Sequence, residues 1–388
     1  MAHAPLNRLA ARTLALLALL SALALPGARP VSATPALAPA KAAAAQETPP
    51  LHTLVPEDVS NFIVANSTVF WYTHCSYNSI GTINRIPVQG GESRQIYKTG
   101  KDCSSPTSFR SNIVADADYV YWASDSGLLR LSTNATVGDQ PQVLSAAAAS
   151  WRTLVIDNDA IYSLHATGSP APTDTYTITV QQVAKADGTT TTLTTHTEKA
   201  EPIGFQVSHA FSEVSGASDY LYWRGSDGLM RYNLNTGALD NILSTLSVFY
   251  AEGGVTSCEN LRCTTTDRVY FSYGQQVSYY NNYDGTTTPV YTAPYQVYDL
   301  ITDKRHLFVH SGFYYGNCSP RCSFFSSYLV TRSRREASRA TTYMYGDFRR
   351  NWNLTIANGY LLWQNNDTLR RLPTDVGLPH LYMPGIRR

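Results

Sequence analysis

A short phrase recurs seven times along this chain of 388 residues and keeps its register. In each copy, a turn containing Asx or Gly is followed by apolar residues that end in an aromatic ring, then by a polar loop and a second strand. From Trp71 to Trp363, six intervals average about 49 residues each. A period of about 40–50 residues with four short strands per unit is typical of a β-propeller. The copies begin at Asn66, Asp116, Asp157, Gly216, Thr265, Thr302 and Ala357.

Each copy can be divided into four strands, A to D, running outwards from the axis. Strand A is an apolar run such as residues 61–65 or 153–157, and an Asx or Gly turn joins it to the aromatic strand B. One large ring per blade at one offset favours packing between neighbouring blades, although a ring of ligand-binding aromatics is the alternative. We therefore predict an all-β fold, a β-propeller with seven blades of four antiparallel strands. Either the ring closes without a borrowed strand, or residues 51–56 pair with the last blade.

The first 33 residues predict a secretory signal peptide. Arg8 and Arg12 precede an apolar run over residues 14–25, and residues 31–33 offer small side chains for cleavage. The run is short for a membrane span, so an uncleaved anchor is only the alternative. There is no Cys beside the cleavage site and no C-terminal anchor pattern, and we expect a secreted protein without an integral membrane span in the mature chain.

Composition divides the rest of the chain in two. Residues 34–57 are rich in Ala and Pro and predict a linker without a packed core, and residues 58–388 predict the propeller domain. The net charge is +1, so nothing indicates a nucleic-acid partner.

Six cysteines behind a signal peptide favour disulfides over a metal site. The spacings CENLRC and CSPRC are not zinc knuckles. Proximity in the repeat favours the pairs Cys75–Cys103, Cys258–Cys263 and Cys318–Cys322, and the strand assignment places all six at one end of the ring, where the B–C and D–A loops lie.

Two phrases, DYVYWASDSGLLRL from Asp118 and DYLYWRGSDGLMRYNLNTG from Asp219, resemble the YWTD repeats of low-density-lipoprotein-receptor-like propellers and of bacterial domains that carry such repeats. The Thr-Asp of that family is replaced after Trp122 and after Trp223, and its best-known form has six blades. The resemblance implies the fold and a general binding role, and it implies no particular partner.

The B–C and D–A loops look long and irregular, whereas the A–B turns look short and uniform. Irregular loops on a rigid scaffold usually carry function. We therefore expect a binding or scaffold module that recognises an extracellular protein or glycan through the B–C/D–A face. The candidate contact residues are His165, Arg224, Asp227, Tyr250, Tyr314, Tyr315 and Arg321.

No catalytic motif stands out, and no catalytic residue, cofactor or metal site is predicted. GxSxG, HExxH, P-loop and GxGxxG patterns are absent. Asp116-Ala117-Asp118 and Asp157-Asn158-Asp159 favour turns over calcium loops, because the remaining EF-hand ligands do not follow. Two alternatives stay open: an extracellular glycosidase or lyase on the same fold, which would need positioned carboxylates, and a structural surface protein without a discrete site.

Overall fold

The computed structural model describes residues 52–56, 58–73, 80–101, 107–148, 153–169, 175–199, 203–208, 220–246, 248–259, 262–282, 284–302, 306–318, 322–333, 340–347, 354–365 and 368–374. All of them belong to the unit Glu47–Arg388. These residues are mostly β-strand, with one 3-10 turn, η1 (Ala146–Ala148). No helix within these ranges is long and apolar enough to cross a membrane.

The described strands form seven four-stranded antiparallel sheets, which are the blades. Blade 1 consists of β2 (Asn61–Ala65), β3 (Thr68–Thr73), β4 (Ile80–Pro87) and β5 (Arg94–Lys101); blade 2 of β6 (Val114–Ala115), β7 (Tyr119–Ser124), β8 (Gly127–Ser132) and β9 (Gln142–Ser145); blade 3 of β10 (Thr153–Ile156), β11 (Ala160–Ser169), β12 (Thr175–Ala184) and β13 (Thr190–Glu198); blade 4 of β14 (Ile203–Ser208), β15 (Tyr220–Gly225), β16 (Gly228–Asn233) and β17 (Leu239–Leu243); blade 5 of β18 (Val248–Glu259), β19 (Arg262–Tyr273), β20 (Gln276–Asn281) and β21 (Thr287–Thr292); blade 6 of β22 (Gln296–Thr302), β23 (His306–Cys318), β24 (Cys322–Ser333) and β25 (Ala340–Asp347); and blade 7 of β26 (Leu354–Ala357), β27 (Tyr360–Asn365), β28 (Thr368–Pro373) and β1 (His52–Val55).

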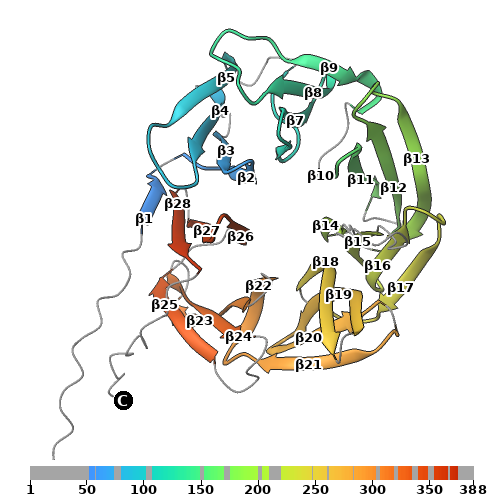
Figure 1. Ribbon diagram of the computed structural model, residues 1–388, viewed down its shortest axis with the longest axis vertical. Coiled ribbons are helices and arrows are strands. Elements are labelled where there is room, and N and C mark those ends of the chain that lie inside the picture. The colour runs from blue at the N-terminus through green and yellow to red at the C-terminus, as the bar shows by residue number, and fades with distance from the viewer. Residues whose placement is uncertain are drawn as a thin grey trace, which may run out of the picture. The chain divides into compact units, whose positions relative to one another are not determined.

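The innermost strands of the blades form a closed ring. Each contacts the innermost strand of the next blade, in the order β2, β6, β10, β14, β18, β22 and β26, and β26 returns to β2. Figure 1 shows the blades arranged around this ring. The predicted all-β propeller fold is confirmed.

The ring closes with a borrowed strand. β1 pairs antiparallel with β28 on the outer edge of blade 7, with His52 opposite Arg371. Of the two closures that the sequence left open, the structure therefore has the one in which residues 51–56 pair with the last blade. It follows that the propeller begins earlier than the predicted boundary at residue 58, because β1 is hydrogen-bonded into a sheet. The segment 379–383, whose sequence PHLYM predicts the last strand of blade 7, lies outside the described residues.

The Asp-rich turns between strands A and B are bends, as predicted. In blade 2, Asp116 Oδ1 accepts the backbone N–H groups of Asp118 and Tyr119 at 3.0 and 2.8 Å. The second oxygen accepts the hydroxyl of Tyr121 at 2.9 Å. Asp157 repeats these contacts in blade 3. These carboxylates therefore replace backbone partners at the turn, which is the usual role of Asx side chains there.

The repeated rings of strand B form the core between blades. Trp122, Trp223 and Trp363 are fully buried, and Trp71 is 5% exposed. Each packs with aliphatic side chains of its own or a neighbouring blade. The packing interpretation of these rings is therefore confirmed, and rings so deeply buried cannot serve as a binding surface.

Successive strands of a blade run in opposite directions, so the A–B and C–D turns lie at one end of the ring, here called the A–B end. The B–C turns and D–A links lie at the other, the B–C end. The expected contrast between the two ends is wrong in two respects. The A–B turn of blade 5 is the tip of a long hairpin, since β18 and β19 pair out to Glu259 and Arg262. The B–C turns of blades 2, 4 and 5 contain only two residues.

Candidate functional site

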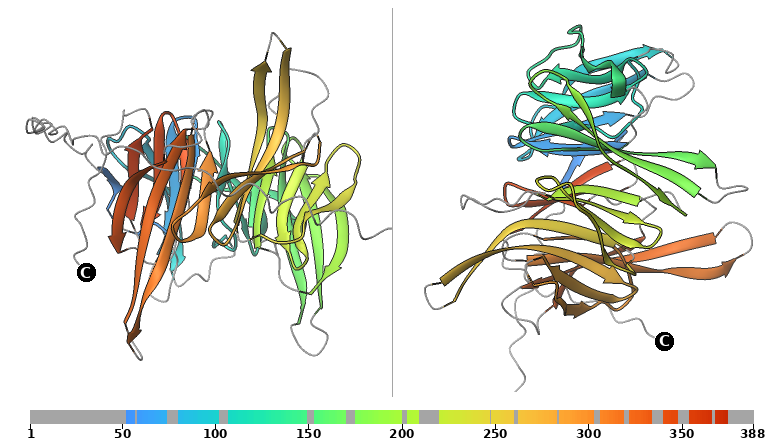
Figure 2. Two further views of the ribbon diagram at one scale, coloured as in Figure 1. Left: turned by 90° about the horizontal axis from the view of Figure 1, so that it is seen from below. Right: turned by 90° about the vertical axis from the view of Figure 1, so that its right-hand side faces the viewer.

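Two hairpins extend the B–C end. β11 and β12 in blade 3 have ten residues each, and β23 and β24 in blade 6 have 13 and 12, whereas the B–C strands of blades 2, 4 and 7 have six. Figure 2 shows these two hairpins projecting to one side and the β18–β19 hairpin projecting to the other. Within the described residues, the blade 6 hairpin has no third strand beyond Ser326, which pairs with Asp347. The B–C end is therefore an uneven surface of two arms and several tight turns.

Close backbone contacts require glycine at the B–C turns of blades 2 and 4. A Cβ on Gly127 in blade 2 would lie 2.2 Å from the carbonyl oxygen of Ser145, and one on Gly228 in blade 4 would lie 1.7 Å from that of Leu243. Both glycines have positive φ, 117° and 131°. Only glycine therefore fits where strand C passes strand D.

Two predicted contact residues, Arg224 and Asp227, flank the B–C turn of blade 4. Arg224 is half-buried at the end of β15, and Asp227 is exposed in the turn itself. The main-chain oxygen of Asp227 accepts the side-chain amide of Asn241 at 2.8 Å, which ties the turn to strand D. The structure thus brings these two residues together on one fixed turn.

A buried carboxylate of blade 3 supports this turn. Glu198, at the end of β13, accepts the indole N–H of Trp223 at 3.1 Å and the backbone N–H of Ser226 at 2.9 Å. Its Oε1 also lies 2.8 Å from Nε2 of His196. A Cβ on Gly225 would lie 2.4 Å from Glu198 Oε2, so the carboxylate needs a glycine there.

Glu198 stays ionised in this buried position. Burial opposes ionisation, but hydrogen bonds from His196, Ser226 and Trp223 outweigh it and lower the pKa of the Glu198 carboxyl. The turn that carries Arg224 and Asp227 therefore rests on a negative charge held inside the blade 3–blade 4 junction.

Blade 2 holds its own turn differently. Arg110, in the link from blade 1, donates Nε and Nη2 to the two carboxylate oxygens of Asp125 at 2.8 and 2.7 Å. The hydrogen bonds from Arg110 lower the pKa of Asp125. Both side chains are about half exposed, so this pair contributes little to stability and much to the shape of the surface.

One exposed ring at the B–C end escaped the sequence reasoning. Tyr273, the last residue of β19, is 65% exposed beside the two-residue turn of blade 5. The backbone N–H of Val297 donates to Gly274, and that of Ala293 donates to Gln275, so the turn beside the ring is fixed. The only local signal was a Tyr just before Gly274, which has a positive φ of 60°.

The other predicted contact residues are only partly placed. His165 is half-buried on β11, opposite Thr179. Tyr250 lies on β18, opposite Tyr270 on β19, so it belongs to a strand and not to a link. Tyr314 and Tyr315 lie on the blade 6 arm, and for these three tyrosines only the backbone is described. Arg321 lies outside the described residues.

The prediction that all six cysteines share one end is wrong. Cys258 and Cys263 are backbone partners near the tip of the β18–β19 hairpin, which projects at the A–B end. Cys318 and Cys322 are backbone partners at the B–C end of blade 6. The reason is that residues 248–259 form strand A of blade 5 and not a link. Cys75 and Cys103 lie outside the described residues.

An inner-strand carboxyl lies at the junction of blades 6 and 7. Asp299 Oδ2 accepts the backbone N–H of Leu354 at 3.2 Å, and Oδ1 accepts that of Leu300 at 2.8 Å. Desolvation raises the pKa of Asp299 to about 7. His310, its cross-strand partner, is buried, and desolvation lowers the pKa of His310 to about 3. In the described part of the chain, no three His, Cys, Asp or Glu side chains gather as a metal site would require.

Comparison with known proteins shows likeness at the level of the fold. No family model and no curated protein matches the chain. Among solved structures, the chain is similar to an oligogalacturonate lyase from Vibrio parahaemolyticus, with a TM-score of 0.53, 10% identity, and 83% of this chain and 93% of that chain covered.

Two further solved structures are similar with lower TM-scores. The WD40 β-propeller domain of Doa1 has a TM-score of 0.48 and 11% identity over 83% of this chain and 96% of that chain. Sqt1 of Saccharomyces cerevisiae has a TM-score of 0.45 and 9% identity over 85% and 98%.

Proposed function

We propose that this protein is a secreted propeller that binds an extracellular protein or glycan through its B–C end. The observation that carries the proposal is the pair of neighbouring fixed turns in blades 4 and 5. One presents Arg224 and Asp227 over buried Glu198, and the next presents the exposed ring of Tyr273. Aromatic and Arg side chains are common binding anchors, and fixed turns lose little entropy on binding.

Two carboxylates at this end, Asp125 and Glu198, support binding over hydrolysis. A glycosidase needs two positioned carboxyl groups facing substrate. Asp125 is held by both nitrogens of the Arg110 edge, and Glu198 is buried under three hydrogen-bond partners. Both have lowered pKa values, the opposite of what a general acid requires.

The test is an array of glycans and secreted proteins probed with the mature chain. We expect a signal that Tyr273→Ala and the double variant Arg224→Ala/Asp227→Ala each weaken. Asp187→Ala, which changes an exposed turn at the A–B end, is the matched control and should bind like the parent. No signal on a broad array, or equal loss in the control, would contradict the proposal.

The blade 6 arm is tested separately. Joining Phe313 to Ser326 with an Asn-Gly turn removes the two-stranded extension and with it Tyr314, Tyr315 and Arg321, while the pairing of Ser326 with Asp347 is retained. Loss of array binding in this variant would extend the contact surface to the arm. Unchanged binding would restrict that surface to blades 4 and 5.

We also propose that two of the three long hairpins carry a disulfide, Cys258–Cys263 in blade 5 and Cys318–Cys322 in blade 6. Paired residues of antiparallel strands have Cα atoms about 4.5–5.5 Å apart, within the range that a disulfide spans. A two-stranded hairpin alone is marginally stable in water, so a disulfide between its strands would stabilise it. Peptide mapping without reduction should find both links, together with Cys75–Cys103; a Cys75–Cys258 link would exclude this pairing.

A further inference from the structure

One cation–π pair recurs across the blades at the A–B end. In blades 2, 4 and 7, an Arg on strand C lies over the ring of the Tyr that begins strand B. The distances from Cζ to the ring centroid are 4.9, 4.8 and 5.1 Å. The pairs are Arg130 with Tyr119, Arg231 with Tyr220, and Arg371 with Tyr360. In blade 5 the two residue types are exchanged. Arg268 lies on strand B, and its Cζ is 4.6 Å from the ring centroid of Tyr279 on strand C.

The same arginines also link blades. Nη1 of Arg231 donates to Asn282 of blade 5 at 2.9 Å, and Nη1 of Arg130 contacts the carbonyl oxygen of Lys185 of blade 3 at 3.5 Å. Nη1 of Arg371 donates to the carbonyl of Val88 in blade 1. Each acceptor lies just after strand C of the following blade. The guanidinium group is therefore a regular connection between neighbouring blades.

Strand D supplies a third partner in blades 2 and 4. Gln142, directly opposite Arg130, accepts its Nε at 3.2 Å. Asp240, directly opposite Arg231, accepts its Nη2 at 2.8 Å. In these blades the arginine is thus stacked on a ring, joined to the next blade, and met by an acceptor on strand D.

Blade 1 keeps the arginine and lacks the other two partners. Arg85 occupies the strand C position, and its Nη1 donates to the carbonyl of Thr133 and to Asn134 of blade 2. Thr68 stands where blades 2, 4 and 7 have Tyr, and Arg94 stands directly opposite Arg85, where blades 2 and 4 have an acceptor. Among the described residues, nothing accepts a hydrogen bond from Nε or Nη2 of Arg85.

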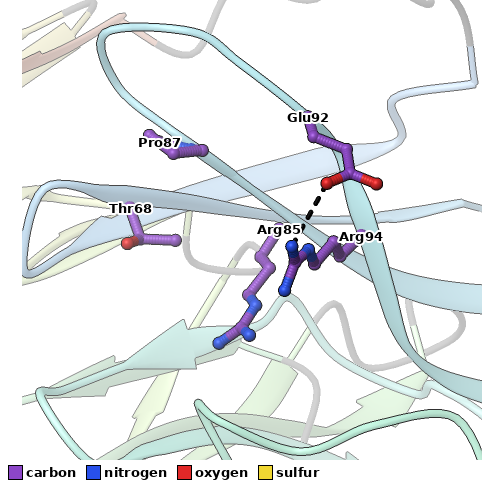
Figure 3. Close-up of a pocket in the computed structure, with 5 residues that line it drawn as sticks. All are labelled: Thr68, Arg85, Pro87, Glu92 and Arg94. Carbon is purple, nitrogen blue, oxygen red and sulfur yellow. Dashed lines mark hydrogen bonds and ion pairs between the residues drawn. The ribbon is translucent and has the colours of Figure 1, made fainter.

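These two replacements leave a hollow. It has a volume of about 360 Å³ and is lined by Thr68, Arg85, Pro87, Glu92 and Arg94. Figure 3 shows the Arg85 and Arg94 side chains lying side by side, with Thr68 opposite. Arg94 contacts Glu92 at 3.2 Å, but these side chains are 64% and 76% exposed, so the pair is weak and easily exchanged.

We propose that this hollow in blade 1 is a binding site for a cyclic carboxylate. The ring of the ligand takes the place of the missing Tyr over Arg85, and its carboxylate takes the place of the missing strand D acceptor. The Nε–Nη2 edge of Arg85 is the edge that Arg110 uses to hold both oxygens of Asp125. The site lies at the opposite end from the proposed B–C surface and does not depend on it.

Two like charges directly opposite each other on neighbouring strands are unfavourable unless an anion lies near them. Glu92 supplies that anion only through an exposed, weak pair with Arg94, which a bound carboxylate can replace. Arg94 then adds a second cation to the carboxylate, and the Arg85 guanidinium offers a flat face to the ring. Aromatic acids and uronic acids share a carboxylate carried on a ring that can lie against the guanidinium; only the aromatic ring adds a cation–π contribution, and the experiment separates the two classes.

Titration calorimetry with the full chain would measure binding of benzoate, glucuronate and acetate. We expect one of the two cyclic acids to bind, and acetate to bind roughly tenfold or more weakly because it has no ring. Thr68→Tyr restores the repeat ring and Arg94→Asp restores the acceptor, so each should weaken binding by roughly tenfold or more. Lys98→Gln removes one exposed charge from the same strand and should leave binding unchanged.

Preference for benzoate would assign an aromatic acid, and preference for glucuronate a uronic acid. No saturable binding of either at millimolar concentration would overturn the proposal, as would acetate binding as tightly as both. It would also be overturned if Thr68→Tyr and Arg94→Asp bound the cyclic acid like the parent chain. Both variants change side chains at the surface of the hollow, and a melting curve confirms that each is folded.

Discussion

Blades 4 and 1 share the repeated arginine on strand C, but this arginine has different partners in the two blades. In blade 4, Arg231 is stacked on Tyr220, bonded to Asp240 and joined to blade 5. In blade 1, Arg85 keeps only its link to blade 2 and faces Arg94. Two replaced side chains thus turn a closed inter-blade connection into an open, cationic hollow. The difference shows that departures from the repeat, more than the repeat itself, are the places to test for a ligand.

The largest expected effect lies at the junction of blades 3 and 4. Glu198→Ala would leave the indole of Trp223 and the backbone N–H of Ser226 buried without an acceptor, and would also remove the partner of His196. We expect a loss of about 3 kcal/mol or more in the free energy of unfolding, measured by urea denaturation. Loss of less than about 1 kcal/mol would mean that water replaces the carboxylate and that the B–C turn of blade 4 does not depend on Glu198.

The free energy of unfolding should depend on pH because of Asp299 in blade 6, so variants of different blades must be compared at one pH. Its pKa in the folded chain is about 7, raised from 3.8, so the folded chain retains a proton that the unfolded chain has lost. Stability from the protonated carboxyl is present below about pH 4 and is lost as the pH rises through about 7. Between these limits, Asp299→Asn should abolish this loss of stability with rising pH.

This pH dependence is measured from denaturation midpoints at closely spaced pH values. Asp284→Asn, on an exposed turn, is the control and should keep the slope of the parent chain. An unchanged slope in Asp299→Asn would show that another group causes the pH dependence.

Arg231 of blade 4 and Arg85 of blade 1 should contribute differently to the free energy of unfolding. Arg231→Ala removes three contacts and should cost about 1–2 kcal/mol, whereas Arg85→Ala removes one link and relieves Arg94, so it should cost less than about 1 kcal/mol. Both are measured by urea denaturation in the absence of ligand. Equal costs would mean that the hollow does not weaken the blade 1–blade 2 junction.

The smallest effect comes from exchanging the strand D residues. Arg94→Asp should stabilise the ligand-free chain by about 0.5 kcal/mol because it converts a like-charge pair into an ion pair. Asp240→Arg should destabilise blade 4 by a similar amount. The sharpest form is the double variant Tyr220→Thr/Asp240→Arg, which copies blade 1 into blade 4. It should gain a site for the same cyclic carboxylate, and failure to do so would show that blade 1 differs in more than these two positions.

Much of the fold followed from the sequence because the repeat is local. Apolar runs, Asx turns and one ring per blade predicted the strands and the buried Trp residues, and blade 2 shows all three within residues 112–132. The sequence also located Arg224 and Asp227 between strands B and C of blade 4, although it predicted a long loop there and the structure has a turn of two residues. Tyr273 and Glu198 were missed, because exposure and burial at a blade junction depend on residues from another blade.

By itself, the sequence determined which residues form strands, where the chain turns and that the repeat needs neighbours to bury its rings. Only the tertiary structure decided that β1 closes the ring, that the Cys258–Cys263 and Cys318–Cys322 hairpins project at opposite ends, and that Arg94 lies opposite Arg85. The physical reason is that strand periodicity sets the side on which a residue lies, whereas strand register and ring closure set which residue it meets.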